Sequence, residues 1–345
     1  MSVTVVVGGQ FGSEGKGKVA QQLARERRAA AVVRVGGSNS GHTGITPSGE
    51  TKVLRHLPTA ALDPHAMCVL AAGSYLDPEL LQEEIESTGL TRDRLLIDEN
   101  AFLIRPGDRD AESAGDLGER IGSTCSGTGA AVTRRVARLS ASDLASSSRD
   151  LQPYVGNTRA FLRACLDRDR QVIIEGTQGF GLSLLHSQHF PNVTSRDTTA
   201  AAVLAETGLS PLDVQDVVLV LRAFPIRVAG NSGGFGSEEI DWATVTREGG
   251  HPDKLVEYTS VTQRVRRVAR FDPDLVRHAI AVNRPSTIAL NHLDHVDAAA
   301  RDGVLTDRAR SFVAEVAAQI GQPVNLVGLG PSSLVPVDDG LALAA

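Results

Sequence analysis

The sequence predicts an α/β fold with a largely parallel central sheet, on two observations. Short runs rich in Val, Ile and Leu alternate with longer helical runs along the chain, which is typical of strand–helix units around a buried parallel sheet. The 345 residues, with 41% hydrophobic content, also suffice for a large core. No repeat or low-complexity linker divides the chain, so we expect one domain over residues 1–345.

The predicted elements follow the chain in alternation. Strands are predicted at Val3–Val7, Ala31–Val35, Met67–Ala72, Gln171–Ile174, Val217–Phe224 and Thr287–Asn291. Helices are predicted at Gly17–Arg28, Pro78–Ser87, Thr158–Asp167, Asp274–Val282 and Asp307–Ile320. Two long loops, Gly36–Gly49 and Gly230–Gly250, are expected to be functional, because loops of this length are uncommon in compact domains. We expect the tail after about Pro331 to be weakly ordered.

Composition limits the partners and the compartment. Charged residues make up 22% of the chain and the net charge is −6, which argues against a general nucleic-acid or membrane-surface binder. Cys68, Cys125 and Cys165 are odd in number and unpatterned, as in a protein of the reducing cytoplasm without a disulfide framework or a cysteine-rich zinc site. The sequence shows no leader and no apolar run of roughly 18 residues. We therefore expect a soluble cytoplasmic protein.

The N-terminal stretch VVVGGQFGSEGKGKVAQQLA has the order strand, glycine-rich turn, helix. This order directs backbone N–H groups and a helix N-terminus at a phosphate. Gly12, Gly15 and Gly17 allow a close approach, and Lys16 or Lys18 can neutralise phosphoryl oxygens. The spacing departs from the Walker pattern, since the residue after Lys16 is a glycine. The alternative is a turn that only packs a helix on the sheet.

A second glycine-rich cluster, GGSNSGHT, spans residues 36–43. Asn39 can read the polar edge of a ring, and His42 can donate to phosphoryl oxygens. Taken alone, a loop histidine is more often structural or solvated.

Together, QFGSEGKGK and GGSNSGHT resemble the signature of the adenylosuccinate synthetases, whose usual forms read close to QWGDEGKGK and GGxNAGHT. The resemblance continues in order through IGSTCSGTGAAVTRRVAR (Ile121–Arg138), EGTQGFGLSLLHSQHFPNVTSRDTT (Glu175–Thr199), TSVTQRVRR (Thr259–Arg267) and LNHLD (Leu290–Asp294). It covers residues 4 to about 331 and implies the P-loop-like fold of that family, with long functional loops.

The resemblance also implies a two-step reaction. The 6-oxo group of a purine monophosphate attacks the γ-phosphate of a nucleoside triphosphate, and the amine of L-aspartate then displaces the new 6-phosphate. Catalytic roles fall on Ser13, Lys16, His42 and Gln178. The triphosphate is expected at Gly12, Glu14, Gly15, Lys16, Gly17, Lys18, Gly41, His42, Thr43, Asn291, His292, Asp294, Gly328, Gly330 and Pro331. Mg²⁺ is expected at Ser13 and at the carbonyl of Gly41.

The other two substrates are assigned in the same way. The acceptor nucleotide is expected at Ser13, Asn39, Ser123, Thr124, Arg138, Gln178 and Thr194, and L-aspartate at Val228, Val261, Thr262, Arg264 and Arg266. Arg138 matches an arginine that reaches in from the neighbouring subunit, which implies a homodimer. Arginines suit a dicarboxylate because their donors form a fork. Without the resemblance, Arg264–Arg267 would more readily be interpreted as surface cations at a helix start.

Ser13 departs from the family, which has an aspartate at this position that takes the proton from N1 of IMP. A serine hydroxyl cannot be that base unaided. The chain is then an inactive paralogue, an IMP enzyme of the short archaeal type with an unusual serine, or an enzyme with a changed substrate. The last reading has support, because QFGS, FPIRVAGNSGGFGSEEIDW and VTQRVRRV resemble a phage branch, the 2-aminoadenylosuccinate synthetases. These act on dGMP to supply diaminopurine for DNA, which would place the protein in a host cytoplasm.

The donor nucleotide is the remaining choice. The family reads guanine through a lysine and an aspartate in a TKxD-like motif, whereas this chain has Asn291, His292, Leu293 and Asp294. Asp294 favours GTP, but the missing lysine and the phage resemblance favour ATP or dATP. A rival from another class is a non-catalytic guanine-nucleotide switch.

Overall fold

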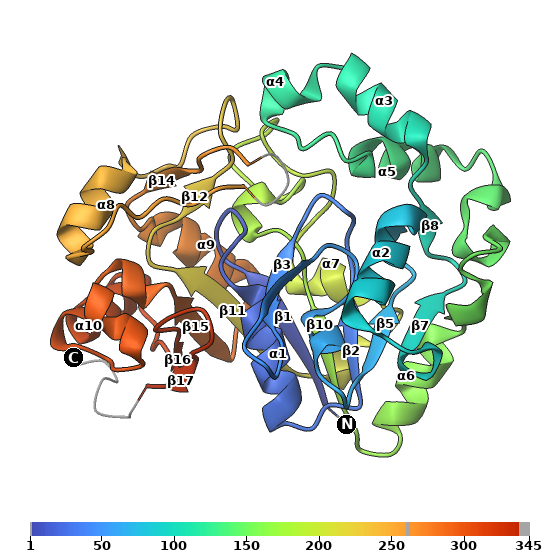
Figure 1. The fold of residues 1–345 in the computed structure, drawn as a ribbon, viewed down its shortest axis with the longest axis horizontal. Helices are drawn as coiled ribbons and strands as arrows, with labels where there is room; N and C mark the ends of the chain where they lie inside the picture. The colour runs from blue at the N-terminus through green and yellow to red at the C-terminus, as the bar shows by residue number, and fades with distance from the viewer. Residues whose placement is uncertain (1, 260–262, 338–345) are drawn as a thin grey trace.

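The computed structural model describes residues 2–259 and 263–337 and has the expected α/β fold, built on a large sheet (Figure 1). In the described residues this sheet has ten strands in the order β17-β16-β15-β11-β1-β10-β2-β5-β7-β9. Every neighbouring pair is parallel except β16 and β17. The prediction of a largely parallel central sheet is therefore confirmed.

All six predicted strands lie in this sheet, within a few residues of the predicted bounds. In sheet order the strands are β17 (Val335–Pro336), β16 (Leu326–Val327), β15 (Thr287–Asn291), β11 (Val214–Arg222), β1 (Ser2–Gly8), β10 (Gln171–Glu175), β2 (Ala31–Arg34), β5 (Met67–Leu70), β7 (Leu95–Asp98) and β9 (Val155–Gly156). The four that the sequence analysis did not identify lie at the two ends of the sheet and have two to four residues.

Helices cover both faces of the sheet, as the buried strands require. They are α1 (Lys16–Glu26), α2 (Pro78–Thr88), α6 (Thr158–Leu166), α7 (Ala200–Ala205), α9 (Pro273–Asn283) and α10 (Asp307–Ile320). Side chains of β1 alternate between the faces: Val6 packs with α1, whereas Val5 and Val7 pack in the cluster that contains residues of α6, α7 and α9. Figure 1 shows α1 in front of the sheet and α7 and α9 behind it.

Two groups of elements stand above the carboxyl ends of the central strands, one on each side (Figure 1). One group contains α3 (Pro106–Ala114), α4 (Leu117–Ile121), α5 (Thr128–Ala137) and the paired strands β6 (Tyr75–Leu76) and β8 (Phe102–Leu103). The other contains β12 (Ile226–Arg227), β13 (Glu239–Ile240), β14 (Arg267–Ala269) and α8 (Trp242–Gly249). Ligands of open α/β folds bind at this edge of the sheet.

The two predicted long loops contain more regular structure than expected. Strand β3 (His42–Ile45) lies within Gly36–Gly49 and pairs with β4 (Thr51–Leu54) in an antiparallel hairpin. Within Gly230–Gly250, α8 begins after Asp241, whose carboxylate accepts from Thr244 N at 2.7 Å. That capping residue was the overlooked signal. The prediction of loops throughout both ranges was wrong.

The C-terminal tail contains one more strand of the sheet. After Pro331 the chain adds β17, which pairs with β16. The expectation of a weakly ordered tail stays a prediction. Residues 338–345 lie outside the described part. Within the described residues, none of the helices combines the length and apolar character needed to cross a membrane.

Candidate active site

The glycine-rich turn between β1 and α1 is organised by a buried carboxylate. Glu14 accepts hydrogen bonds from the backbone N–H groups of Gln10 (3.1 Å) and Gly12 (2.8 Å) and from Nζ of Lys16 (2.6 Å). Its side chain is fully buried. Glu14 therefore faces its own turn and not the pocket. The structure does not bring this side chain to the expected triphosphate site.

The helix that follows the turn leaves its N-terminus open to the pocket. Gly15 occupies the N-cap position with a φ of 91° and offers no side-chain cap. The first N–H groups of α1 thus have no capping side chain, which suits an anion. Gly15, Lys16, Gly17 and Lys18 all line the cavity.

Ser13 lies in the same turn with a left-handed backbone, at a φ of 57°. A residue with a Cβ atom adopts this region at a cost of roughly 1 kcal/mol. A guanidinium stabilises it, because Nη1 of Arg222 donates to the Ser13 carbonyl at 3.1 Å. Ser13 is half-buried and lines the cavity.

The last predicted triphosphate residues divide into two sets. His292, Asp294, Gly330 and Pro331 line the cavity. Asn291 is buried beneath it and donates to the Glu14 carbonyl at 2.8 Å, and Gly328 packs against that Asn291 side chain. The structure does not bring Asn291 and Gly328 to the pocket. They join the segment after β15 to the glycine-rich turn between β1 and α1, here called the phosphate turn.

Lys18 makes the same connection. Its ammonium donates to the carbonyls of Gly330 (3.0 Å) and Ser333 (3.1 Å). Burial lowers the pKa of Lys18 to about 8, against the opposing effect of Asp294. Asp294 itself has Arg301 at 3.6 Å.

His42 is held by a buried ion pair that the sequence analysis did not identify. Nδ1 of His42 lies 2.5 Å from Oε1 of Glu175, and Nη1 of Arg34 lies 3.1 Å from that same oxygen. The other Glu175 oxygen accepts from the backbone and hydroxyl of Thr59. Burial and the charge of Arg34 lower the pKa of His42 to about 3. Burial alone would raise the pKa of Glu175, but the hydrogen bond from His42 and the charges around it hold it at about 2.

This arrangement bears on the expected role of His42. A neutral ring whose Nδ1–H faces Glu175 has its lone pair on Nε2, and Nη1 of Arg34 lies near both ring nitrogens, at 2.9 Å from Nε2. The expected donation from His42 to a phosphoryl oxygen stays a prediction. A phosphate beside it would favour the protonated ring, because an adjacent negative charge raises the pKa of an imidazole.

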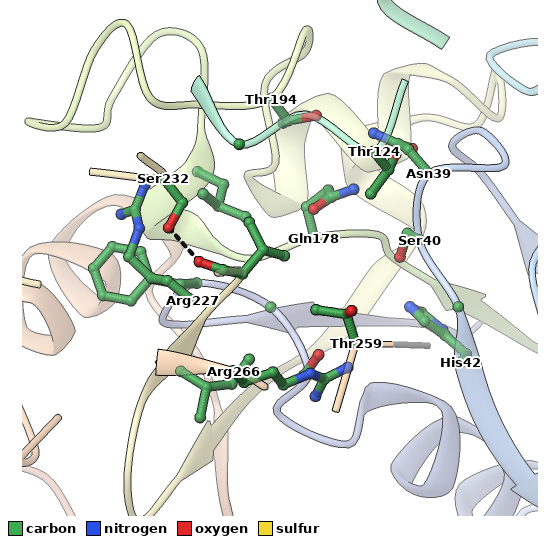
Figure 2. A pocket seen from close by; sticks show the side chains of 18 of the residues that line it. Asn39, Ser40, His42, Thr124, Gln178, Thr194, Arg227, Ser232, Thr259 and Arg266 are labelled. Carbon is green, nitrogen blue, oxygen red and sulfur yellow. Dashed lines mark hydrogen bonds between the residues drawn. The ribbon is translucent and has the colours of Figure 1, made fainter. Parts of the chain in front are cut away.

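The predicted acceptor residues form one wall of the cavity. Asn39, Thr124, Thr194 and Gln178 follow this wall in Figure 2, and Ser123 lines it as well. Gly41 and Thr43 also line the cavity beside His42.

Arg138 lies elsewhere. It is exposed at the C-terminal cap of α5, where its side chain donates to the Val136 carbonyl. Within one chain the structure does not bring Arg138 to the pocket.

The opposite wall carries the predicted aspartate residue Arg266 (Figure 2). Val228, the other predicted aspartate residue, also lines the cavity. Nη1 of Arg266 donates to Glu257 at 3.0 Å. Arg264 is exposed and does not line the cavity, although its backbone exchanges hydrogen bonds with Thr259. Val261 and Thr262 lie outside the described residues.

Arg227 adds a cation at this end of the cavity. It is buried above the ring of Phe11 at 4.5 Å and donates to the carbonyls of Asn192 and Gly234. Burial and the charge of Arg267 lower its pKa to about 10.

Three of the charged residues that the sequence analysis missed share one position in the fold. Arg34, Glu175 and Arg222 are each the last residue of a central strand and follow a run of apolar residues, at the carboxyl edge of the sheet. A charged residue that ends a buried strand was the available signal.

All these walls enclose one cavity of about 850 Å³. It extends from the phosphate turn to the segment between α8 and β14. A volume of this size is in the upper part of the range found for ligand pockets.

The chain resembles known proteins over nearly its whole length. A family model described as "Adenylosuccinate synthetase" matches residues 5–142 and 140–304. The adenylosuccinate synthetase of Thermococcus sibiricus is 36% identical over 338 residues, which make up 95% of each protein. The solved succinoaminodeoxyadenylate synthetase of cyanophage S-2L, bound to dGMP and to dATP as an energy donor, is 29% identical with a TM-score of 0.82, over 97% of this chain and 95% of that one. Adenylosuccinate synthetase from Plasmodium falciparum shares the fold at 20% identity, with a TM-score of 0.81, over 98% of this chain and 100% of that one.

Proposed function

Since this chain belongs to the adenylosuccinate synthetase family, and is therefore a carbon–nitrogen ligase, we propose that its acceptor is dGMP. The product would be 2-amino-2′-deoxy-N6-succinyladenylate, a diaminopurine precursor for modified DNA. The observation that carries the proposal is Ser13, a half-buried residue that lines the cavity at the position where the family motif has a carboxylate. Membership of a ligase family leaves the nucleotide-switch alternative without support.

Guanine differs from hypoxanthine by a 2-amino group beside N1. A serine leaves room for this group and offers an oxygen that can accept from it. The solved phage enzyme bound to dGMP, which is similar over nearly the whole chain, supports this reading.

The other carboxylates of the cavity are already engaged. Among the described lining residues these are Glu112, Glu257 and Asp294. Glu112 accepts from the backbone N–H groups at residues 127, 129 and 130, Glu257 pairs with Arg222, and Asp294 faces Arg301. We therefore propose that the N1 proton leaves to bound L-aspartate or to a water molecule, not to a replacement carboxylate of the protein.

The phosphoryl-transfer step would use the turn and the walls together. Lys16 and the N-terminus of α1 would neutralise the transferred group, and His42 would hydrogen-bond to an oxygen on it. Gln178 would hold the 6-oxygen of the acceptor as charge develops there. Each of these residues lines the same cavity.

Mg²⁺ fits the residues at this position. The Ser13 hydroxyl and the Gly41 carbonyl are oxygens of the kind that Mg²⁺ prefers, and both residues line the cavity. No group of three His, Cys, Asp or Glu suited to a metal occurs in the described residues. Mg²⁺ commonly keeps few protein ligands and takes the rest from substrate phosphates and water. When bound, it would supply neutralisation of the phosphate charge.

For the donor we propose ATP or dATP. His292 replaces the lysine of the family motif and is neutral, since burial and the charge of Arg222 hold its pKa well below the usual value. Arg301 faces Asp294, which reduces the availability of that carboxylate to guanine N–H groups. The family's usual donor is of the GTP type, so GTP is the competing donor.

We also propose that Arg138 acts in a homodimer. It lies between Val136 and Leu139, whose side chains are 69% and 77% exposed. Apolar side chains beside an exposed arginine are typical of protein interfaces. L-Aspartate would bind at Arg266 and Val228.

The second candidate is an IMP-using enzyme of the short archaeal type. The observation that favours it is the 36% identity to the archaeal adenylosuccinate synthetase, which exceeds the 29% to the phage enzyme.

Mass spectrometry of the products decides between the two candidates. The purified protein is incubated with L-aspartate and Mg²⁺, with dGMP, GMP or IMP as the acceptor and ATP, dATP or GTP as the donor. The proposal expects the succinyl adduct of dGMP, with ATP or dATP as the better donor. An adduct formed faster from IMP would overturn the dGMP assignment, and the donor comparison would separately decide the donor.

A further inference from the structure

Arg222 ends β11 with a side chain that has no exposed surface, although it lies just beneath the cavity. Its backbone is fixed by one amide side chain from the phosphate turn. Arg222 N donates to Oε1 of Gln10 at 2.9 Å, and Nε2 of Gln10 donates back to the Arg222 carbonyl at 3.1 Å. The position of this strand end is thereby tied to the phosphate turn.

The guanidinium reaches in two directions. Nη1 donates to the Ser13 carbonyl at 3.1 Å and also lies 3.3 Å from Oε2 of Glu257, while Nη2 pairs with Oε1 of Glu257. The planar fork of an arginine can span two acceptors in this way, whereas a lysine ammonium is a single point of charge. Arg222 therefore contacts the turn and the opposite wall at once.

Glu257 also binds Arg266. Its Oε2 accepts from Nη1 of Arg266 at 3.0 Å, and its backbone carbonyl accepts from Arg266 N at 2.9 Å. Glu257 is 18% exposed and Arg266 16% exposed, and both line the cavity. The contacts form one continuous series from Ser13 through Arg222 and Glu257 to Arg266.

A buried ion pair by itself says little about function, because such pairs often only compensate charges. This pair differs in what its two ends hold. One end holds a serine with a left-handed backbone, and the other holds the arginine predicted to bind a carboxylate of L-aspartate. Arg222 also donates to a neutral carbonyl at Ser13, which charge compensation does not require.

We propose that Arg222 is a positioning residue that fixes the guanidinium of Arg266, through Glu257, relative to the phosphate turn. The inference rests on the proposed role of Arg266 as an L-aspartate contact and does not depend on which purine is the acceptor. Arg222 holds Arg266 in the position from which it can meet the dicarboxylate.

The test compares Arg222→Lys with Arg270→Lys in the full-length enzyme. Arg270 forms a bidentate pair with Glu248, at 2.5 and 2.8 Å, and does not line the active-site cavity. It therefore serves as a matched arginine–glutamate control. Steady-state kinetics are measured with whichever acceptor nucleotide the wild-type enzyme uses, so a failure of the dGMP assignment leaves this test intact.

For Arg222→Lys we expect the KM for L-aspartate to rise about tenfold or more, since a buried, charge-assisted contact is lost. The KM for the donor nucleotide should stay within about threefold of the wild-type value, because the phosphate turn keeps its Glu14–Lys16 pair. Arg270→Lys should leave both constants near the wild-type values. A purely structural role would lower the melting temperature and the active fraction, with the KM for L-aspartate unchanged, and that result overturns the proposal.

Glu257→Gln keeps the test decisive if Arg222→Lys fails to fold. The amide has the shape of the carboxylate but can no longer accept from both arginines with full charge. The proposal expects the KM for L-aspartate to rise in this variant too. A folded Glu257→Gln enzyme with an unchanged KM for L-aspartate would refute the connection between Arg222 and Arg266.

Discussion

Two carboxylates flank the cavity, and each contacts one fully or nearly fully buried arginine and one residue that lines the cavity. Glu175 lies fully buried between Arg34 and His42. Glu257, which is 18% exposed, lies between Arg222 and Arg266. Both are ionised: His42 and its neighbours hold the pKa of Glu175 at about 2, and Arg222 with its neighbours lowers that of Glu257 well below its usual range.

The difference between them lies in the fold around each carboxylate. Glu175 and Arg34 are paired neighbours on adjacent strands β10 and β2. Glu257 belongs to the connection between α8 and β14 and reaches the sheet only through Arg222. Glu175 thus fixes which ring nitrogen of the neutral His42 carries the proton. Glu257 fixes where the guanidinium of Arg266, a permanent cation, is located. In the proposed function, the Glu175 side serves phosphoryl transfer and the Glu257 side binds L-aspartate.

The largest expected effect comes from Glu175→Gln. The amide cannot hold the Nδ1–H tautomer of His42 as the carboxylate does, and it leaves Arg34 without its counter-charge. We expect kcat to fall about 100-fold or more, in the range found for oriented acid–base groups. Phosphate release in the presence of L-aspartate measures this.

Glu84→Gln is the matched control for that variant. Glu84 is also a buried carboxylate, which accepts from the backbone N–H groups at residues 55, 56 and 57, away from the cavity. It should lose stability with kcat within about threefold of the wild-type value. If both variants lose kcat equally, the Glu175 side has no special role and the comparison fails.

A smaller effect is expected from Ser13→Asp. Ser13 is the residue at which the series of contacts through Arg222 and Glu257 begins. The added carboxylate takes space beside the acceptor ring and meets the 2-amino group of guanine. We expect kcat/KM for dGMP to fall about 10- to 100-fold. Initial rates with dGMP and IMP, measured in parallel, report the change in preference.

Ser13→Asn separates size from charge in that experiment. Asparagine tolerates the left-handed backbone at this position, and it has the size of aspartate without the charge. Loss of dGMP use in both variants assigns the effect to volume. A Ser13→Asp enzyme that uses dGMP as well as the wild-type enzyme would contradict the steric part of the argument.

Part of the fold and of the site was predictable from the sequence. The six central strands were predictable because a strand buried on both faces is a continuous apolar run, and the phosphate turn was predictable because its glycines and lysines are contiguous. Helices α3 to α5 were not predicted from the segment that contains IGSTCSGTG, which has glycine and hydroxyl residues in place of a regular apolar period.

The two carboxylate clusters could not be predicted, because each depends on strand order. Glu175 meets Arg34 only since β10 lies beside β2, 141 residues apart in sequence. Arg222 meets Ser13 across 209 residues, by way of β11 and β1. No local spacing records these pairings. Glu14, Asn291 and Gly328 were predicted to contact the triphosphate. The sequence alone could not show that these residues face the protein interior and not the pocket.

The smallest expected effect concerns the free energy of unfolding at low pH. The question is whether its loss in acid comes from the Glu175 side of the cavity or from a buried imidazole elsewhere. His56 is buried outside the cavity, where its Nε2 accepts from Asp77 N at 3.1 Å. Burial lowers its pKa from 6.5 to about 3. Between these two pH values the unfolded chain takes up a proton that the folded chain does not, so stability is retained above pH 6.5 and is lost as the pH falls through this window.

His56→Gln should remove this contribution, since glutamine can still accept from Asp77 N but does not titrate. We expect the slope of unfolding free energy against pH to flatten by at most about 1.4 kcal/mol per pH unit between pH 6 and 4. Urea unfolding at several pH values measures it. Glu175→Gln, measured alongside, should keep the His56 contribution. If instead it flattens the slope and His56→Gln does not, the acid sensitivity resides in the Glu175 cluster and the two sides of the cavity differ in stability as well as in chemistry.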